Sequence, residues 1–99
     1  MPSVTLRDTL ALCCESGRVC PQPAQWSELY ELLPGRRSDG YGAIPAAPLV
    51  AAAWAETGDM HKVERLREHL EWAERHGALD AVHAYLASLD EAGWHHFGD

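Results

Sequence analysis

The sequence predicts an all-α fold: a compact bundle of four to five short helices with a C-terminal antiparallel helical hairpin. Two observations predict this class. Apolar residues recur at spacings of three and four residues through most of the chain, and the β-branched and aromatic runs typical of strands are missing. The chain of 99 residues is long enough for one core but too short for two. We therefore expect a single helical domain over residues 1–99.

The first two helices are predicted over Leu6–Ser16 and Pro23–Leu33. Thr5, with Asp8 three residues later, has the pattern of a capping box, and Gly17 ends the first helix. Pro23 suits the first position of the second helix. The apolar stripe of the first helix consists of Leu6, Leu10, Cys13 and Cys14, and that of the second of Trp26, Leu29, Tyr30 and Leu33.

A loop rich in Gly and Pro is predicted over residues 34–45, and a third helix over Ala47–Glu56. The third helix is apolar nearly all round, which is typical of a central, buried helix. We expect the helix that carries Trp54 to lie at the centre of the bundle.

The C-terminal hairpin is predicted from two further helices, Met60–His76 and Ala81–Leu89, with Asp59 and Asp80 as their N-caps. The two helices begin with the same pattern, 19 residues apart: a glycine, then an apolar residue (Met60 or Leu79) placed to pack back on its helix, then an amphipathic helix. This repeat indicates antiparallel neighbours joined by a tight turn. Val63, Leu66, Leu70 and Ala73 form the core stripe of the longer helix, and Val82, Tyr85, Leu86 and Leu89 that of the other. Residues 93–99 are expected to form a flexible tail with at most one short helical turn.

The charge of the chain is −7, and it is uneven: residues 1–45 carry five acidic and four basic side chains, and residues 46–99 carry ten and four. An acidic surface repels phosphate backbones and anionic lipids. We therefore expect neither direct nucleic-acid binding nor membrane binding. The absence of a signal peptide or an apolar segment of spanning length, together with three cysteines in no disulfide pattern, indicates a cytoplasmic protein. The amino-acid usage suits a bacterial genome rich in G and C.

The histidines and cysteines give no recognised metal pattern. His69 and His76 lie about 10.5 Å apart along a helix axis, too far for one ion, and adjacent Cys13 and Cys14 diverge by about 100°. Cys20 is able to approach Cys13 across the turn at Gly17, although small buried thiols are the commoner arrangement. No catalytic triad pattern is evident. We expect no cofactor, no metal and no enzymatic activity.

The residue that stands out most is Trp72, which lies off the core stripe of its helix, beside Arg65, His69 and His76. One interpretation is that another helix or the C-terminal tail covers it, since large apolar groups are usually buried within their own domain. The other is an exposed aromatic and basic patch that docks a partner or a second copy, because interfaces prefer Trp, Tyr and Arg.

The predicted loop offers a second candidate surface in Arg36, Arg37 and Tyr41. The stretch Gly35–Gly40 has the glycine spacing of a phosphate-binding loop but lacks the Lys and Ser or Thr that should follow, so we reject that function. The paired arginines suit an acidic or phosphorylated group, or they are a solvated loop tip.

Three functions follow as hypotheses. The first is a bacterial cytosolic protein–protein interaction module, an adaptor or regulator, with an unknown protein partner or a homodimer. The second is an acidic inhibitor of the nucleic-acid-mimic or immunity type that binds a basic target. The third is a small metal- or thiol-based sensor.

Overall fold

The computed structural model describes residues 4–33, 52 and 54–99, and within them α1 (Leu6–Cys14) is the first helix. Thr5 Oγ1 accepts the Asp8 N–H and the Asp8 carboxylate accepts the Thr5 N–H, so the predicted capping box is confirmed. Of the predicted stripe, Cys13 is buried whereas Cys14 is exposed. A short 3₁₀ turn, η1 (Glu15–Gly17), then ends the helical stretch.

The second helix, α2 (Pro23–Glu31), begins at the predicted proline and ends two residues earlier than predicted. The predicted stripe is confirmed: Trp26, Leu29, Tyr30 and Leu33 are all buried. The predicted loop 34–45, and six of the ten residues of the predicted third helix, lie outside the described residues. Trp54 is only partly buried against the core, and Ala52, Ala55 and Glu56 are exposed, so the prediction that this helix lies at the centre of the bundle is wrong for its described residues.

The two long C-terminal helices are α4 (Asp59–Arg75) and α5 (Leu79–Ser88), joined by a turn in which Gly77 has a φ of +72°. That left-handed backbone is the conformation that glycine adopts without strain at a helix end. Both N-cap predictions are wrong, because Gly58 and Ala78 occupy the cap positions and neither Asp59 nor Asp80 does. The two carboxylates bind other parts of the chain: Asp80 accepts the N–H of Val4, and Asp59 accepts from the C-terminal strand.

The predicted all-α class is wrong in one respect, which is a two-stranded antiparallel sheet of β1 (Arg18–Pro21) and β2 (Trp94–His96). The C-terminal element of the chain is therefore a strand, and the molecule does not end in a helical hairpin. Arg18 pairs with His96, Cys20 with His95 and Pro21 with Trp94, with an irregularity between Arg18 and Cys20. The reason for the error is that each strand has only three or four residues, too few for a periodic pattern, and that their partners lie far apart in the sequence.

The predicted flexible tail, residues 93–99, contains this strand. A 3₁₀ turn, η2 (Glu91–Gly93), leads into it, and the Asp90 carboxylate caps that turn at the N–H of Gly93. Trp94 is 1% exposed, and its carbonyl oxygen accepts from the side chain of Gln22. The tail is thus held against β1 by backbone pairing and by a buried indole.

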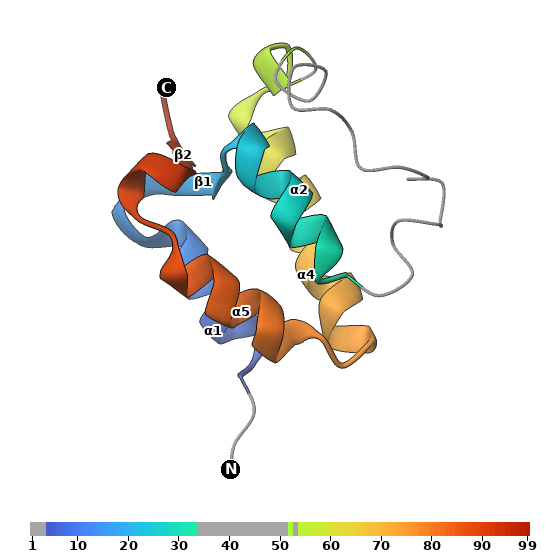
Figure 1. Ribbon diagram of the computed structural model, residues 1–99. Coiled ribbons are helices and arrows are strands. Elements are labelled where there is room, and N and C mark those ends of the chain that lie inside the picture. Colours follow the sequence, from blue (N-terminus) through green and yellow to red (C-terminus); the bar gives the residue numbers. More distant parts are fainter. Residues whose placement is uncertain (1–3, 34–51, 53) are drawn as a thin grey trace.

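The helices lie in two pairs: α1 lies beside α5, and α2 packs on α4, where Trp26 and Tyr30 contact His69. The sheet lies at one end of the molecule (Figure 1). α4 contacts α1, α5 and β1, so it links the pairs and the sheet. One apolar core lies between these elements. Its fully enclosed large apolar side chains come from α2 and the turn that follows it, from α4 and α5, and from both strands: Val19, Trp26, Leu29, Leu33, Leu66, Leu70, Val82, Leu86 and Trp94.

Candidate docking face on helix α4

Four of the residues singled out from the sequence, Arg65, His69, Trp72 and His76, lie on α4 as expected. The other three, Arg36, Arg37 and Tyr41, lie outside the described residues. Of the four residues on α4, His69 is buried, Trp72 is half-buried, and Arg65 and His76 are exposed.

His69 belongs to the core, so its assignment to an exposed patch is wrong. It is 1% exposed, and its ring packs 5.1 Å from that of Trp26 and 5.3 Å from that of Tyr30, measured between ring centroids. Its Nδ1–H donates to the carbonyl oxygen of Arg65 at 2.8 Å. α2 packs on the side of α4 that lies next to its apolar stripe. It therefore buries His69, although His69 is not part of that stripe.

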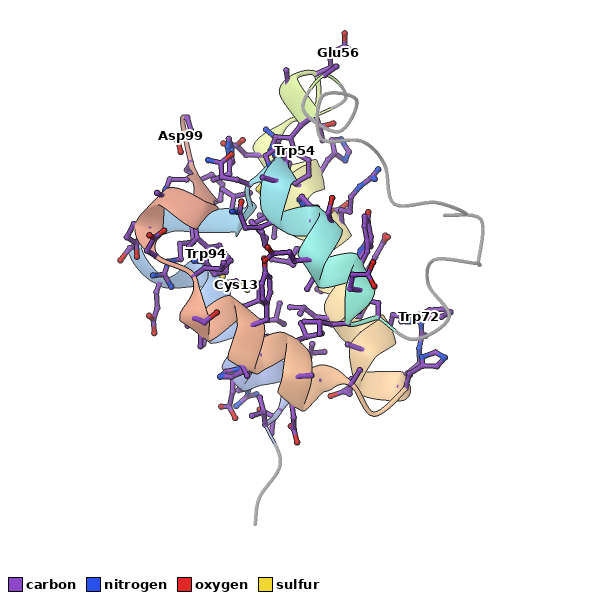
Figure 2. The ribbon with its side chains drawn as sticks, in the orientation of Figure 1. Cys13, Trp54, Glu56, Trp72, Trp94 and Asp99 are labelled. Carbon is purple, nitrogen blue, oxygen red and sulfur yellow. The ribbon has the colours of Figure 1, made fainter. Side chains whose placement is uncertain are left out.

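Trp72 is half-buried, so it is neither fully covered by its own domain nor fully exposed, the two interpretations of its role. Part of the indole packs against the core cluster. The ring stacks on that of exposed His76, with centroids 4.2 Å apart and an interplanar angle of 19°, and the guanidinium carbon of Arg75 lies 5.8 Å from its centroid. The C-terminal strand does not cover it, because Trp72 and Trp94 lie on different sides of the molecule (Figure 2).

Three residues form a row on the outer side of α4, which we call the α4 row: Glu68, Trp72 and Arg75. Their spacing of four and three residues places them on one helix face. Glu68 and Arg75 are exposed, and neither forms an ion pair within the part of the chain that the structure describes. The row therefore presents an acid, an aromatic ring and a base in order along the surface.

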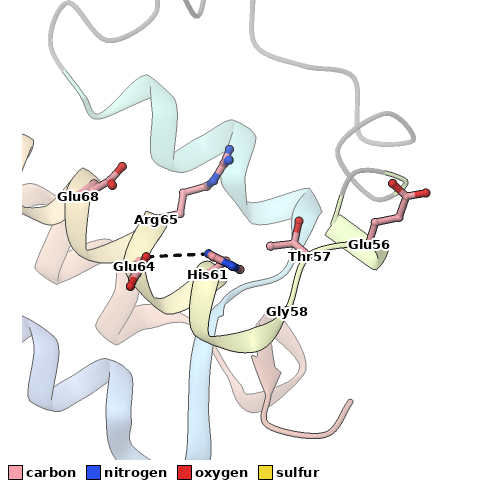
Figure 3. A pocket seen from close by; sticks show the side chains of 7 residues that line it. All are labelled: Glu56, Thr57, Gly58, His61, Glu64, Arg65 and Glu68. Atoms are coloured by element: carbon pink, nitrogen blue, oxygen red, sulfur yellow. Dashed lines mark ion pairs between the residues drawn. The ribbon is translucent and has the colours of Figure 1, made fainter.

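A surface hollow of about 390 Å³ adjoins the acidic end of the row (Figure 3). Its lining contains three glutamates and two groups of basic type, and is made of Glu56, Thr57, Gly58, His61, Glu64, Arg65 and Glu68. His61 Nδ1 lies 4.0 Å from the Glu64 carboxylate, and the Arg65 side chain points toward α2. The exposed surface of α4 thus carries acids and bases at both ends: Glu64 and Glu68 lie near Arg65 and Arg67, and Arg75 and His76 lie near Glu71 and Glu74.

A polar cluster at the first turn of α4, which sequence reasoning missed, fixes the C-terminal strand. His95 Nε2 donates to Asp59 Oδ1 at 3.0 Å, and the Gly98 N–H donates to Asp59 Oδ2 at 3.2 Å. These two hydrogen bonds hold the pKa of the Asp59 carboxyl below its ordinary value. Lys62, itself buried, lies 3.6 Å from the same carboxylate, with its ammonium 5.4 Å from the ring centroid of Trp54.

A second carboxylate holds the other face of the strand. Glu91 accepts from the Arg18 guanidinium, and His96 Nε2 donates to it at 2.7 Å. The hydrogen bond from Arg18, and then that from His96, hold the pKa of the Glu91 carboxyl below its ordinary range. The Arg18 guanidinium also lies over the Trp94 ring, 4.9 Å from its centroid. Adjacent His95 and His96 therefore anchor opposite faces of β2.

The buried cysteines are poor candidates for chemistry. Burial raises the pKa of the Cys13 thiol to about 12 and also raises that of Cys20, which is 0% exposed. Cys20 lies opposite His95 in the sheet, and His95 is hydrogen-bonded to Asp59, so a thiol, an imidazole and a carboxylate lie close together. The Cys20 thiol, however, has no access to solvent. A thiol that stays protonated and enclosed does not act as a nucleophile.

Within residues 4–33, 52 and 54–99, no group of three or more His, Cys, Asp or Glu side chains is placed to hold a metal ion. The described residues therefore give the metal-sensor hypothesis no site. Among the helices described, none has both the length and the apolar character needed to cross a bilayer. Comparison of the chain with protein-family models, curated proteins and solved structures gives no match.

Proposed function

We propose that the protein is a small protein–protein interaction module, an adaptor or regulator without catalytic activity, that binds through the outer face of α4. The observation that carries this proposal is the half-exposed indole of Trp72, stacked on His76 and flanked by Arg75. Trp and Arg are among the residues that contribute most to the centres of protein interfaces. Stacking on His76 also restricts the indole before binding, which lowers the entropy lost when a partner docks.

We further propose that the module acts in the bacterial cytosol. Three free cysteines, two of them buried, suit a reducing compartment. The amino-acid usage of the chain supports a bacterial source.

The test is affinity capture from a bacterial lysate with three immobilised forms of the protein: wild type, Trp72→Ala and Met60→Ala. Met60 is a matched control, because it is a large apolar side chain, 66% exposed, on the same helix but outside the α4 row. We expect a defined protein to bind wild type and Met60→Ala and to be lost from Trp72→Ala. Capture of the same lysate protein in equal amounts by all three forms would contradict the proposal.

A second candidate, an acidic inhibitor of a basic target, is favoured by the hollow that Glu56, Glu64 and Glu68 line. Complementary charge steers association, and salt screens it. If this candidate is correct, capture falls steeply as salt is raised and is lost in a variant with Glu64→Gln and Glu68→Gln. Capture that is indifferent to salt would exclude it.

A further inference from the structure

The order of charges along the α4 row carries a further inference. Glu68 and Arg75 are seven residues apart, so they lie about 10.5 Å apart along the helix axis with Trp72 between them. Glu64 lies one turn before Glu68, and His76 follows Arg75. Glu71, also exposed, lies one turn before Arg75 and flanks the row at its middle. Read in the opposite direction, the same row presents a base, an aromatic ring and an acid.

We propose that the occupant of the α4 row is a second copy of this chain, bound with the two α4 helices antiparallel about a two-fold axis close to Trp72. This inference rests on the proposed function and names the partner of the same face. The pairing brings Glu68 of each copy opposite Arg75 of the other, and the two indoles meet near the axis. A two-fold interface of this kind uses one patch twice, and so requires a self-complementary surface.

Charge fixes the direction of the pairing. A parallel arrangement opposes Glu68 to Glu68 and Arg75 to Arg75, and like charges placed opposite each other are unfavourable. Neither residue forms an ion pair with another described residue of its own chain, so pairing with a second copy breaks no ion pair among those residues. Arg65 lines the hollow beside Glu64 and Glu68, and its side chain points toward α2, away from the Glu68 carboxylate (Figure 3).

The size of the contact predicts a weak dimer. α4 has 17 residues, so its length is about 26 Å, and one helix face of that length gives a contact at the low end of interface sizes. We therefore expect a dissociation constant in the micromolar range or weaker, with affinity that falls as ionic strength rises.

The experiment is sedimentation equilibrium over a concentration series, with wild type, Glu68→Arg, Arg75→Glu and an equimolar mixture of the two variants. We expect wild type to dimerise and each variant alone to lose at least about tenfold in affinity, because both bridges become like-charge contacts. In the mixture, every opposed pair is again of opposite sign, so a heterodimer forms. Far-UV circular dichroism checks that each variant folds, and Glu68→Gln with Arg75→Gln supplies a neutral version.

Wild type that is monomeric at about 1 mM, or a mixture that does not regain the dimer, overturns the second copy as partner. The proposed function fails on a separate result, which is capture from the lysate that is unchanged by Trp72→Ala. A monomer with Trp72-dependent capture therefore rejects this inference and leaves the interaction module standing. A dimer that persists unchanged in all charge variants uses another face, and it rejects the inference as well.

Discussion

His95 Nε2 donates a 3.0 Å hydrogen bond to Asp59 Oδ1, and this bond joins the C-terminal strand to the first turn of α4. The two residues are 36 positions apart in the sequence, and the His95 side chain is 7% exposed. The Asp59 carboxylate also accepts the N–H of Gly98 and forms an ion pair with Lys62 at 3.6 Å, so this one acid has two hydrogen-bond donors and one further cation around it. Loss of the imidazole leaves a charged acceptor without its nearest partner.

We therefore expect His95→Ala to lower the melting temperature by about 4–8 °C or more, the shift that a loss of about 1 kcal/mol produces in a domain of this size. His96→Ala is the matched control, because it removes an adjacent imidazole that binds Glu91 but is 27% exposed. Its effect should be smaller, since exposed ion pairs contribute little. Thermal unfolding followed by circular dichroism measures both, and an equal loss would show that burial of the Asp59 pair is unimportant.

The acid stability of the protein should depend on Asp59 and Glu91. Their pKa values in the folded state are lowered from ordinary values of 3.8 and 4.5, so their contribution is complete above those values. It is lost as the pH falls through the lower pKa values of the folded state, because the unfolded chain then binds more protons. Melting temperatures from pH 7 to pH 2 should thus fall less in a variant with Asp59→Asn and Glu91→Gln than in wild type. Parallel curves would contradict the assignment.

Two tryptophans should differ in their contribution to stability. Trp26 is 1% exposed at the centre of the core, and Trp26→Ala should cost about 3–5 kcal/mol of the free energy of unfolding. Trp72 is only half-buried, and Trp72→Ala should cost about 1 kcal/mol and leave the fold intact. Urea denaturation measures both. Unfolding of Trp72→Ala in buffer would mean that this indole is a core residue and that the docking face is wrongly placed.

The three thiols should react at different rates. Cys14 is exposed, whereas Cys13 and Cys20 are buried and their pKa values are raised by burial. Since the thiolate is the reactive species, an aromatic disulfide reagent should titrate one thiol per native chain and three after denaturation. The Cys14→Ser variant should show no fast reaction. Rapid reaction of two or more native thiols would indicate that the region around β1 opens readily.

The elements that could be predicted are those whose evidence is local. The stripe from Trp26 to Leu33 and the capping box of Thr5 and Asp8 each lie within a few turns of one helix, so sequence spacing alone indicates them. β1 and β2 could not be predicted in the same way, because Cys20 and His95 meet only in the folded chain. The bond between His95 and Asp59 has no sequence signature for the same reason.

The candidate face was predicted in part. Trp72 lies off the apolar stripe, and it is half-exposed, stacked on His76. His69 was misplaced because α4 is buried along a second line beside its apolar stripe. On that line, α2 covers His69, and Lys62, seven residues earlier, is buried near Trp54. Because the buried residues on that second line are polar, the spacing of apolar residues does not indicate that this side of the helix is buried.

The pairing of β1 with β2 has a consequence for the order of events during synthesis. Arg18 and His96 pair across most of the chain, so the ladder closes a very long loop and forms after the local helices. On the ribosome, β1 leaves the exit tunnel before β2 and the indole of Trp94 have been made. Until then the nascent chain exposes the unpaired edge of β1 and an incomplete core, which is the interval in which chaperones bind such chains.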